Sequence, residues 1–129
     1  MEDITKKWVE RAKYDLDTAK AMFDAHRYLY VAFMCQQAIE KILKAIIIDK
    51  GKEVLRTHNL VRLAEIAEVY NLMGDETKNL FMDLTPFAIE ARYGDYRDRL
   101  SEIIDRRASL DYLEKTEKIF KCLRKKIKK

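Results

Sequence analysis

The chain reads YVAFMCQQAIEKILKAIII from Tyr30 to Ile48, and this stretch decides the fold. Its apolar side chains recur on more than one side of a helix, which is the pattern of a central helix with two buried faces. The pattern predicts a helix from about Arg27 to Lys50, and Gly51 is well placed to end it with a left-handed residue. The most apolar run, residues 45–48, is far shorter than the ~20 residues needed to span a bilayer.

A narrow polar strip interrupts this apolar helix. It consists of two rows of side chains one helical turn apart, which are Gln36, Glu40 and Lys44, and beside them Gln37 and Lys41. Two interpretations are open. The strip is either solvated, with weak pairing between glutamate and lysine, or its first row faces a groove shared with His58 and Arg92.

Helical periodicity extends to both sides of the central helix. Residues from about Asp3 to Ala25 form one apolar stripe with steps of three and four, which consists of Ile4, Trp8, Ala12, Leu16, Ala19 and Phe23. Thr57 is predicted to cap a third helix that carries residues 60–70. A fourth pattern continues across Pro86, so we expect a kink there, and Gly94 ends it.

The last helix is predicted to begin between Ser101 and Asp105 and to continue with the seam of a bundle helix. The composition agrees with this pattern, because only three glycines and one proline occur in 129 residues. Short connections between long helices imply antiparallel neighbours. We therefore predict an all-α fold, an up-and-down bundle of four or five helices that forms one domain over residues 1–129.

Charge is distributed unevenly along the chain. Residues 115–129 contain eight basic residues and one acid, so this end carries +7; the whole chain carries +4, and the rest therefore sums to −3. The basic end either attracts phosphates or is a solvated, fraying terminus. The abundance of Lys, Arg and Glu beside few Asn and Gln favours a thermophilic source.

The first residues lack the apolar core of a signal peptide, so we expect a soluble, cytoplasmic protein with no membrane contact. Its two cysteines, Cys35 and Cys122, match no CxxC spacing. We therefore expect both to be free thiols in a reducing compartment.

Residues 91–96 read ARYGDY, at the point where a long apolar pattern ends. An arginine fork can bind a phosphate or a carboxylate, and tyrosines can stack on a base or contact a partner. Arg92, Tyr93, Asp95 and Tyr96 are therefore candidate binding residues.

Catalytic patterns are missing from the sequence. The only two histidines, His26 and His58, have no metal-ligating neighbour at helical spacing, and the three glycines are isolated. His58 close to a helix start is typical of a structural hydrogen-bonding role. We predict no catalytic residue, no metal and no cofactor.

Three segments in order, CQQAIEKILKA at 35–45, HNL at 58–60 and ARY at 91–93, resemble the HEPN family (higher eukaryotes and prokaryotes nucleotide-binding). The resemblance implies a bundle of four or five helices and a homodimer. Many prokaryotic members are encoded beside a minimal nucleotidyltransferase and act as one half of a toxin–antitoxin pair. A large branch are metal-independent ribonucleases that use Arg-x(4–6)-His, whose two residues meet across a dimer cleft.

This ribonuclease motif does not occur in the chain. The residues five to seven positions after Arg92 are Arg97, Asp98 and Arg99, and no arginine stands five to seven positions before either histidine. The resemblance therefore implies the non-nuclease branch, in which Arg92 holds a nucleotide phosphate or a partner carboxylate. The alternative for Arg92 is a pair with Glu40 or Asp95 that only fixes the helix end.

Three functions follow. The first is a non-catalytic HEPN protein that homodimerises and binds a nucleotide, an RNA or a nucleotidyltransferase partner. Its expected site residues are Gln36, Glu40, Lys44, His58, Arg92, Tyr93, Asp95 and Tyr96. The second is a ribonuclease with atypical catalytic residues, such as Arg92, Arg97 and His58. The third is an interaction protein whose apolar surface is its interface.

Overall fold

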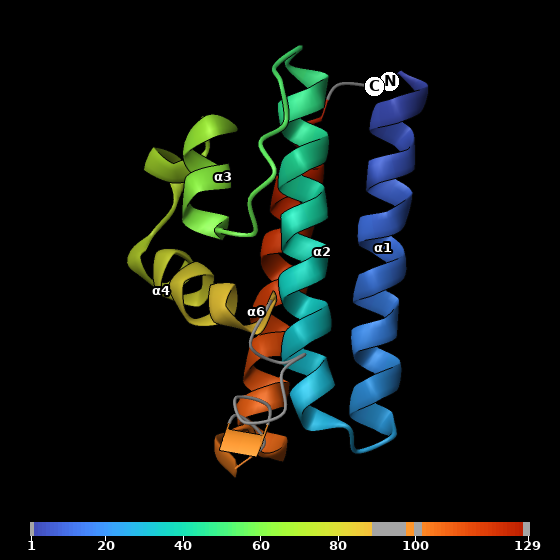
Figure 1. Ribbon diagram of the computed structural model, residues 1–129, viewed down its shortest axis with the longest axis vertical. Coiled ribbons are helices and arrows are strands. Elements are labelled where there is room, and N and C mark those ends of the chain that lie inside the picture. Colours follow the sequence, from blue (N-terminus) through green and yellow to red (C-terminus); the bar gives the residue numbers. More distant parts are fainter. Residues whose placement is uncertain (1, 89–97, 100–101, 128–129) are drawn as a thin grey trace.

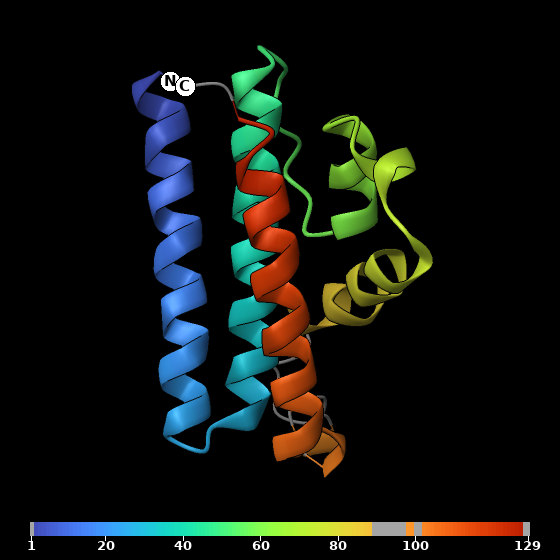
Figure 2. The ribbon, with the colours of Figure 1, turned by 180° about the vertical axis from the view of Figure 1, so that it is seen from behind.

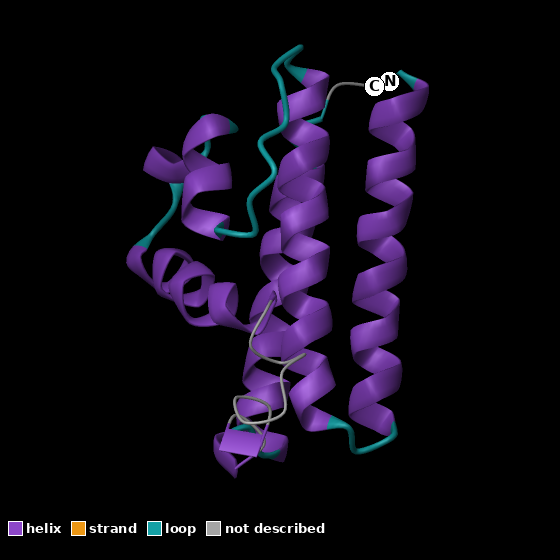
Figure 3. Ribbon diagram, viewed as in Figure 1, coloured by secondary structure: helices purple, strands orange, loops and turns teal. Residues whose placement is uncertain are grey.

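The computed structural model describes residues 2–88, 98–99 and 102–127, which form helices, turns and loops without a strand (Figure 3). The α-helices are α1 (Asp3–Asp24), α2 (Tyr28–Asp49), α3 (Leu60–Ile66), α4 (Asp75–Leu84) and α6 (Arg106–Arg124). Two 3-10 turns, η1 (Tyr70–Leu72) and η2 (Thr85–Ala88), follow α3 and α4. The predicted all-α fold is confirmed.

Three long helices form the body of the molecule, with α1 and α6 packed against α2 (Figures 1 and 2). The short turn between α1 and α2 makes these two helices antiparallel, whereas α6 runs in the same direction as α2 (Figure 1). The shorter helices α3 and α4 lie on the flank of α2 that faces away from α1. This second layer carries the chain from the end of α2 back to the start of α6.

Helix α2 is the centre of the core. Its buried apolar side chains include Val31, Ala32, Cys35, Ala38, Ile39, Ile42, Leu43, Ala45, Ile46 and Ile47. Each buried isoleucine or leucine contributes about 1.5–3 kcal/mol relative to an exposed one. The helix bounds lie within one residue of the prediction, and Gly51 has the expected left-handed conformation with φ 75°.

The apolar stripe of α1 differs from the prediction at its start. Ala12, Leu16 and Ala19 are buried, but Ile4 is 53% exposed and the neighbouring Thr5 is buried instead. Thr5 lies two turns before Ala12 on a helix of 3.6 residues per turn, so it is the residue that faces the core. The predicted inward position of Ile4 was wrong.

The start of α3 also differs from the prediction. Asn59, and not Thr57, caps this helix, because its Oδ1 accepts a hydrogen bond from the backbone N–H of Arg62 at 3.1 Å. The Thr57 hydroxyl accepts the backbone N–H of Asn59 at 3.2 Å and so forms the turn before the cap. The helix ends at Ile66, before a residue with positive φ, Glu68.

Pro86 ends the regular α-helix. Proline lacks an N–H and its ring clashes with the carbonyl four residues earlier. Helix α4 therefore stops at Leu84 and continues over Pro86 as the tighter turn η2. The predicted continuation to Gly94 lies outside the described residues.

Helix α6 begins where the sequence predicts. The Asp105 side chain accepts the backbone N–H of Ala108 at 2.8 Å and so caps the helix. The helix runs without a break to Arg124, and both Leu123 and Ile127 are buried. Up to residue 127 this end is therefore packed through its apolar residues, while most of its lysines are exposed, and both interpretations of the basic end stay open.

Candidate functional site

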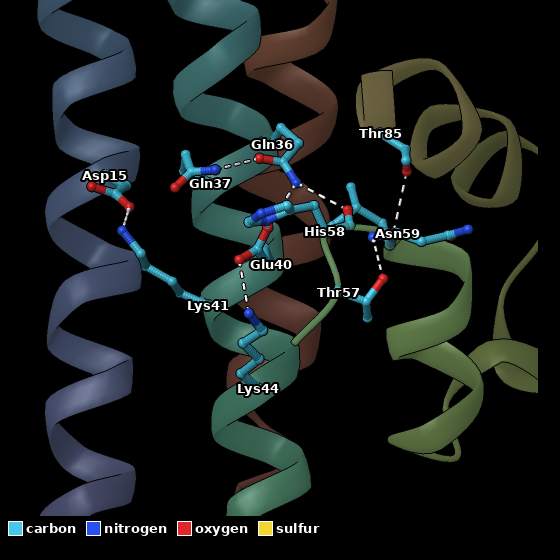
Figure 4. A network of polar contacts seen from close by, with 11 residues as sticks. Asp15, Gln36, Gln37, Glu40, Lys41, Lys44, Thr57, His58, Asn59 and Thr85 are labelled. Carbon is cyan, nitrogen blue, oxygen red and sulfur yellow. Dashed lines mark hydrogen bonds and ion pairs between the residues drawn. The ribbon is translucent and has the colours of Figure 1, made fainter. Parts of the chain in front are cut away.

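The first polar row of α2 is buried. Gln36, Glu40 and Lys44 are 0%, 4% and 8% exposed, so the interpretation as a solvated strip was wrong. The row lies on the side of α2 that faces away from α6, between α1 and the chain that leads into α3 (Figure 4). A charged row inside a protein is stable only when each of its polar groups has a partner.

Glu40 receives three of these partners. Its Oε1 accepts from Gln36 Nε2 at 3.0 Å and lies 2.7 Å from His58 Nδ1, and its Oε2 accepts from Lys44 Nζ at 2.9 Å (Figure 4). Burial raises the pKa of Glu40, but the hydrogen bonds from Gln36, Lys44 and His58 outweigh burial and hold this pKa below its ordinary value. Glu40 is therefore ionised at neutral pH.

His58 reaches α2 because the turn before α3 is fixed by its own hydrogen bonds. Gln36 Nε2 also donates to the backbone oxygen of His58 at 3.2 Å. On the other side, the hydroxyl of Thr85 accepts the backbone N–H of Leu60 at 3.2 Å. The asparagine cap of α3 lies between these two contacts, so the His58 backbone is held from both sides.

The ionised carboxylate of Glu40 sets the tautomer of His58. A carboxylate only accepts hydrogen bonds, so Nδ1 of the imidazole carries a proton and donates it. Nε2 is then the ring nitrogen that is not used in the contact with Glu40, and the side chain is 45% exposed. An oriented imidazole of this kind can bind an anion when doubly protonated and can transfer a proton.

Helix α1 adds charges and an aromatic ring to the same face. Lys41 pairs with Asp15 of α1 (Figure 4), and Gln37 donates to Gln36 Oε1 at 2.6 Å. Lys44 Nζ lies 5.8 Å from the centre of the Trp8 ring. Periodicity alone identified neither Trp8 nor Asp15 as part of this cluster.

A signal for Asp15 was nevertheless present in the sequence. It stands three residues after Ala12 and four before Ala19, so it belongs to the buried side of α1. A carboxylate on an apolar stripe requires a partner, and a lysine of α2 supplies it.

The structure thus brings together Gln36, Glu40, Lys44 and His58. That this row faces a groove shared with Arg92 stays a prediction. The other four candidates, Arg92, Tyr93, Asp95 and Tyr96, lie outside the described residues, and their approach to this row stays a prediction. In the described part of the chain, no three His, Cys, Asp or Glu side chains are grouped closely enough to hold a metal ion. No described helix is long and apolar enough to cross a membrane.

Comparisons with known proteins give the same family as the sequence motifs. The crystal structure of TT1696 from Thermus thermophilus superimposes with a TM-score of 0.83 and 21% sequence identity, over 98% of this chain and 100% of that chain. This similarity concerns the fold. A search of curated proteins finds no match. The family model of the HEPN domain matches residues 5–126, so the chain belongs to the HEPN family.

Proposed function

We propose that this protein is a non-catalytic HEPN protein that homodimerises and binds a nucleotide, or a nucleotidyltransferase partner, at the face of α2 that carries Glu40 and His58. The observation that carries the proposal is the contact of 2.7 Å between His58 Nδ1 and the buried Glu40 carboxylate. A buried, ionised group that orients an exposed imidazole prepares that imidazole for an outside ligand.

A phosphate is the ligand that fits this imidazole best. A doubly protonated ring keeps its bond to Glu40 through Nδ1 and donates from Nε2 to a phosphate oxygen. We propose that Arg92 holds the same phosphate and that Tyr93, Asp95 and Tyr96 border the site. As one half of a toxin–antitoxin pair, the protein would offer the same face to the nucleotidyltransferase.

Fluorescence of Trp8, the only tryptophan in the chain, provides the assay. ATP, GTP and a short RNA are titrated into wild-type protein and into His58→Asn. Loss of one charge-assisted hydrogen bond is expected to weaken binding about tenfold or more.

The matched control is His26→Asn. His26 is also exposed, and it has a φ of 61°, a conformation that asparagine tolerates. This variant is expected to bind as wild type does. No fluorescence change at about millimolar ligand would remove the nucleotide version, and co-purification with the nucleotidyltransferase then tests the partner version.

The pair Glu40 and His58 also favours a second candidate function, that of a metal-independent ribonuclease. A carboxylate that fixes Nδ1 and leaves Nε2 for the substrate is also the arrangement of a general acid or base. Incubation of RNA with wild type and His58→Asn in the presence of a chelator separates the two functions. Cleavage by the wild type alone would overturn the non-catalytic proposal.

A further inference from the structure

The outer face of α6 separates its charges along the helix axis. The inner face, which packs on the core, consists of Ser109, Leu113, Thr116, Phe120 and Leu123. On the exposed side, Asp111 and Glu114 occupy the first half of the helix. Lys118 and Lys121 follow on its second half, and Lys125 caps its end. These three lysines, spaced three and four residues apart, are called the basic face below. Figure 2 shows α6 in front of α2, with no other described helix over this side.

The lysines of the basic face differ from most other lysines of the molecule in having no acidic partner. Lys13, Lys41, Lys44, Lys50, Lys52 and Lys115 each form an ion pair. Glu117, the single acid after residue 114, lies 3.6 Å from Lys20 of α1. Within the described residues, no carboxylate lies at ion-pair distance from Lys118, Lys121 or Lys125.

Helix structure alone does not account for this arrangement. The helix dipole favours cations only in the last turn, where Lys121 and Arg124 stand. Lys118 lies before that turn, and it faces the same side as the other two. The packing of Leu123 and Ile127 holds the lysines on an ordered element, so their spacing is fixed.

We propose that the basic face binds the phosphodiester backbone of a nucleic acid without reading its bases. Seven residues of helix span about 10 Å at ~1.5 Å per residue. In a duplex, each strand presents one phosphate about every 3.4 Å along the helix axis, so about three phosphates lie within this length when it is measured along that axis. A protein partner would require an apolar centre in the contact, and the basic face consists of lysines.

The surroundings of the basic face set the direction of the bound strand. Between α4 and α6 lies a groove of about 260 Å³, with Lys118 and Cys122 on its wall and Glu76 on the α4 side. Glu76 repels a backbone that would cross towards α4. The strand is therefore expected to follow the second half of α6.

This site is independent of the proposed function, because α6 lies behind α2 when the molecule is seen from the side that carries His58 (Figures 1 and 4). Failure at one face therefore leaves the proposal for the other face standing.

Fluorescence anisotropy tests the proposal with a single-stranded RNA, a duplex DNA and a poly-glutamate peptide. The variant Lys118→Gln/Lys121→Gln/Lys125→Gln is compared with Lys6→Gln/Lys7→Gln/Lys13→Gln, which removes three exposed lysines of α1 and has the same net charge. Wild type and control are expected to bind both nucleic acids, and the basic-face variant to bind at least about tenfold more weakly at low salt. Its slope of log K against log salt should fall by about 2 to 3.

Three results would overturn the proposal. The first is an equal loss of binding in both triple variants, which would be an effect of net charge alone. The second is peptide binding as tight as RNA binding, which would indicate an acidic protein partner. The third is no binding of either nucleic acid at low salt. Binding to only one of the two nucleic acids would support the proposal and would show whether the bound backbone belongs to single-stranded RNA or to duplex DNA.

Cys122 gives a second, local measurement. It is exposed between Lys121 and Lys125, whereas Cys35 is fully buried and burial raises its pKa to about 12. A thiol reagent at neutral pH is therefore expected to modify Cys122 alone. Saturating RNA should slow this modification several-fold in the wild type, and an unchanged rate would show that RNA binds elsewhere.

Discussion

Helices α2 and α6 are neighbours that both carry lysines at helical spacing, yet the two sets have opposite surroundings. Lys44 of α2 is buried and donates to Glu40 at 2.9 Å. Lys118 of α6 is exposed, and no described carboxylate pairs with it. Spacing of three or four residues therefore predicts which side chains share a face, but what covers that face decides whether a charge is structural or free to meet a ligand.

The energetic consequences of the two settings differ accordingly. Taking a charge out of water costs several kcal/mol, which only good geometry and further hydrogen bonds offset. The row of α2 meets this condition through Gln36, Lys44 and His58. The lysines of α6 stay hydrated and involve no such cost.

The largest expected effect is in the buried row. Glu40→Gln leaves the Lys44 charge buried without its partner, which is expected to lower the free energy of unfolding by about 3–5 kcal/mol. Urea denaturation followed by circular dichroism measures this loss. The control is Glu68→Gln, since Glu68 is an exposed carboxylate near Lys50 and Lys52. Equal midpoints for the two variants would contradict the structural role of Glu40.

A smaller effect is expected in the dependence of stability on pH. The pKa of Glu40 is lower in the folded protein than the ordinary 4.5, so the folded state binds this proton less readily than the unfolded state. Its contribution is complete above about pH 4.5 and is lost as the pH falls through the folded pKa. Urea midpoints between pH 7 and pH 3 should therefore fall more steeply for wild type than for Glu40→Gln. Parallel curves would show that another carboxylate is responsible.

The smallest effect is expected at the basic face. Lys118→Gln/Lys121→Gln/Lys125→Gln removes charges that pair with no described acid, so thermal unfolding should occur at nearly the wild-type temperature. A loss of stability comparable to that of Glu40→Gln would mean that these lysines serve the fold. The contrast between the two helices would then be wrong.

The sequence predicts the helices better than it predicts their environment. Local periodicity sets the bounds of α2 to within one residue, and it also places Gln36, Glu40 and Lys44 in one row. Burial of that row depends on His58, a residue 18 positions beyond Glu40 that only tertiary structure brings there. No pattern within α2 contains this information.

Two further predictions differ from the structure, at the starts of α3 and of the apolar stripe of α1. Thr57 and Asn59 are both good cap residues, and the contact of Leu60 with Thr85 of the second layer favours the later start of α3. The buried stripe of α1 could start at Ile4 or at Thr5, which are adjacent in the sequence. The prediction chose Ile4 because its side chain is apolar, and this choice was wrong. In the first case a distant neighbour decides between two local alternatives, and in the second the period of 3.6 residues per turn decides.

The polar row of α2 also determines how this helix is turned about its own axis. Apart from the row, α2 is apolar around most of its circumference, so many rotational settings would bury similar apolar area. A turn of one residue, about 100°, would carry Glu40 away from His58 and towards apolar neighbours, at a cost of several kcal/mol. The contact between Glu40 and His58 thus contributes to the uniqueness of the packing. Every other rotation of α2 would break this contact, and the rest of the domain packs on α2.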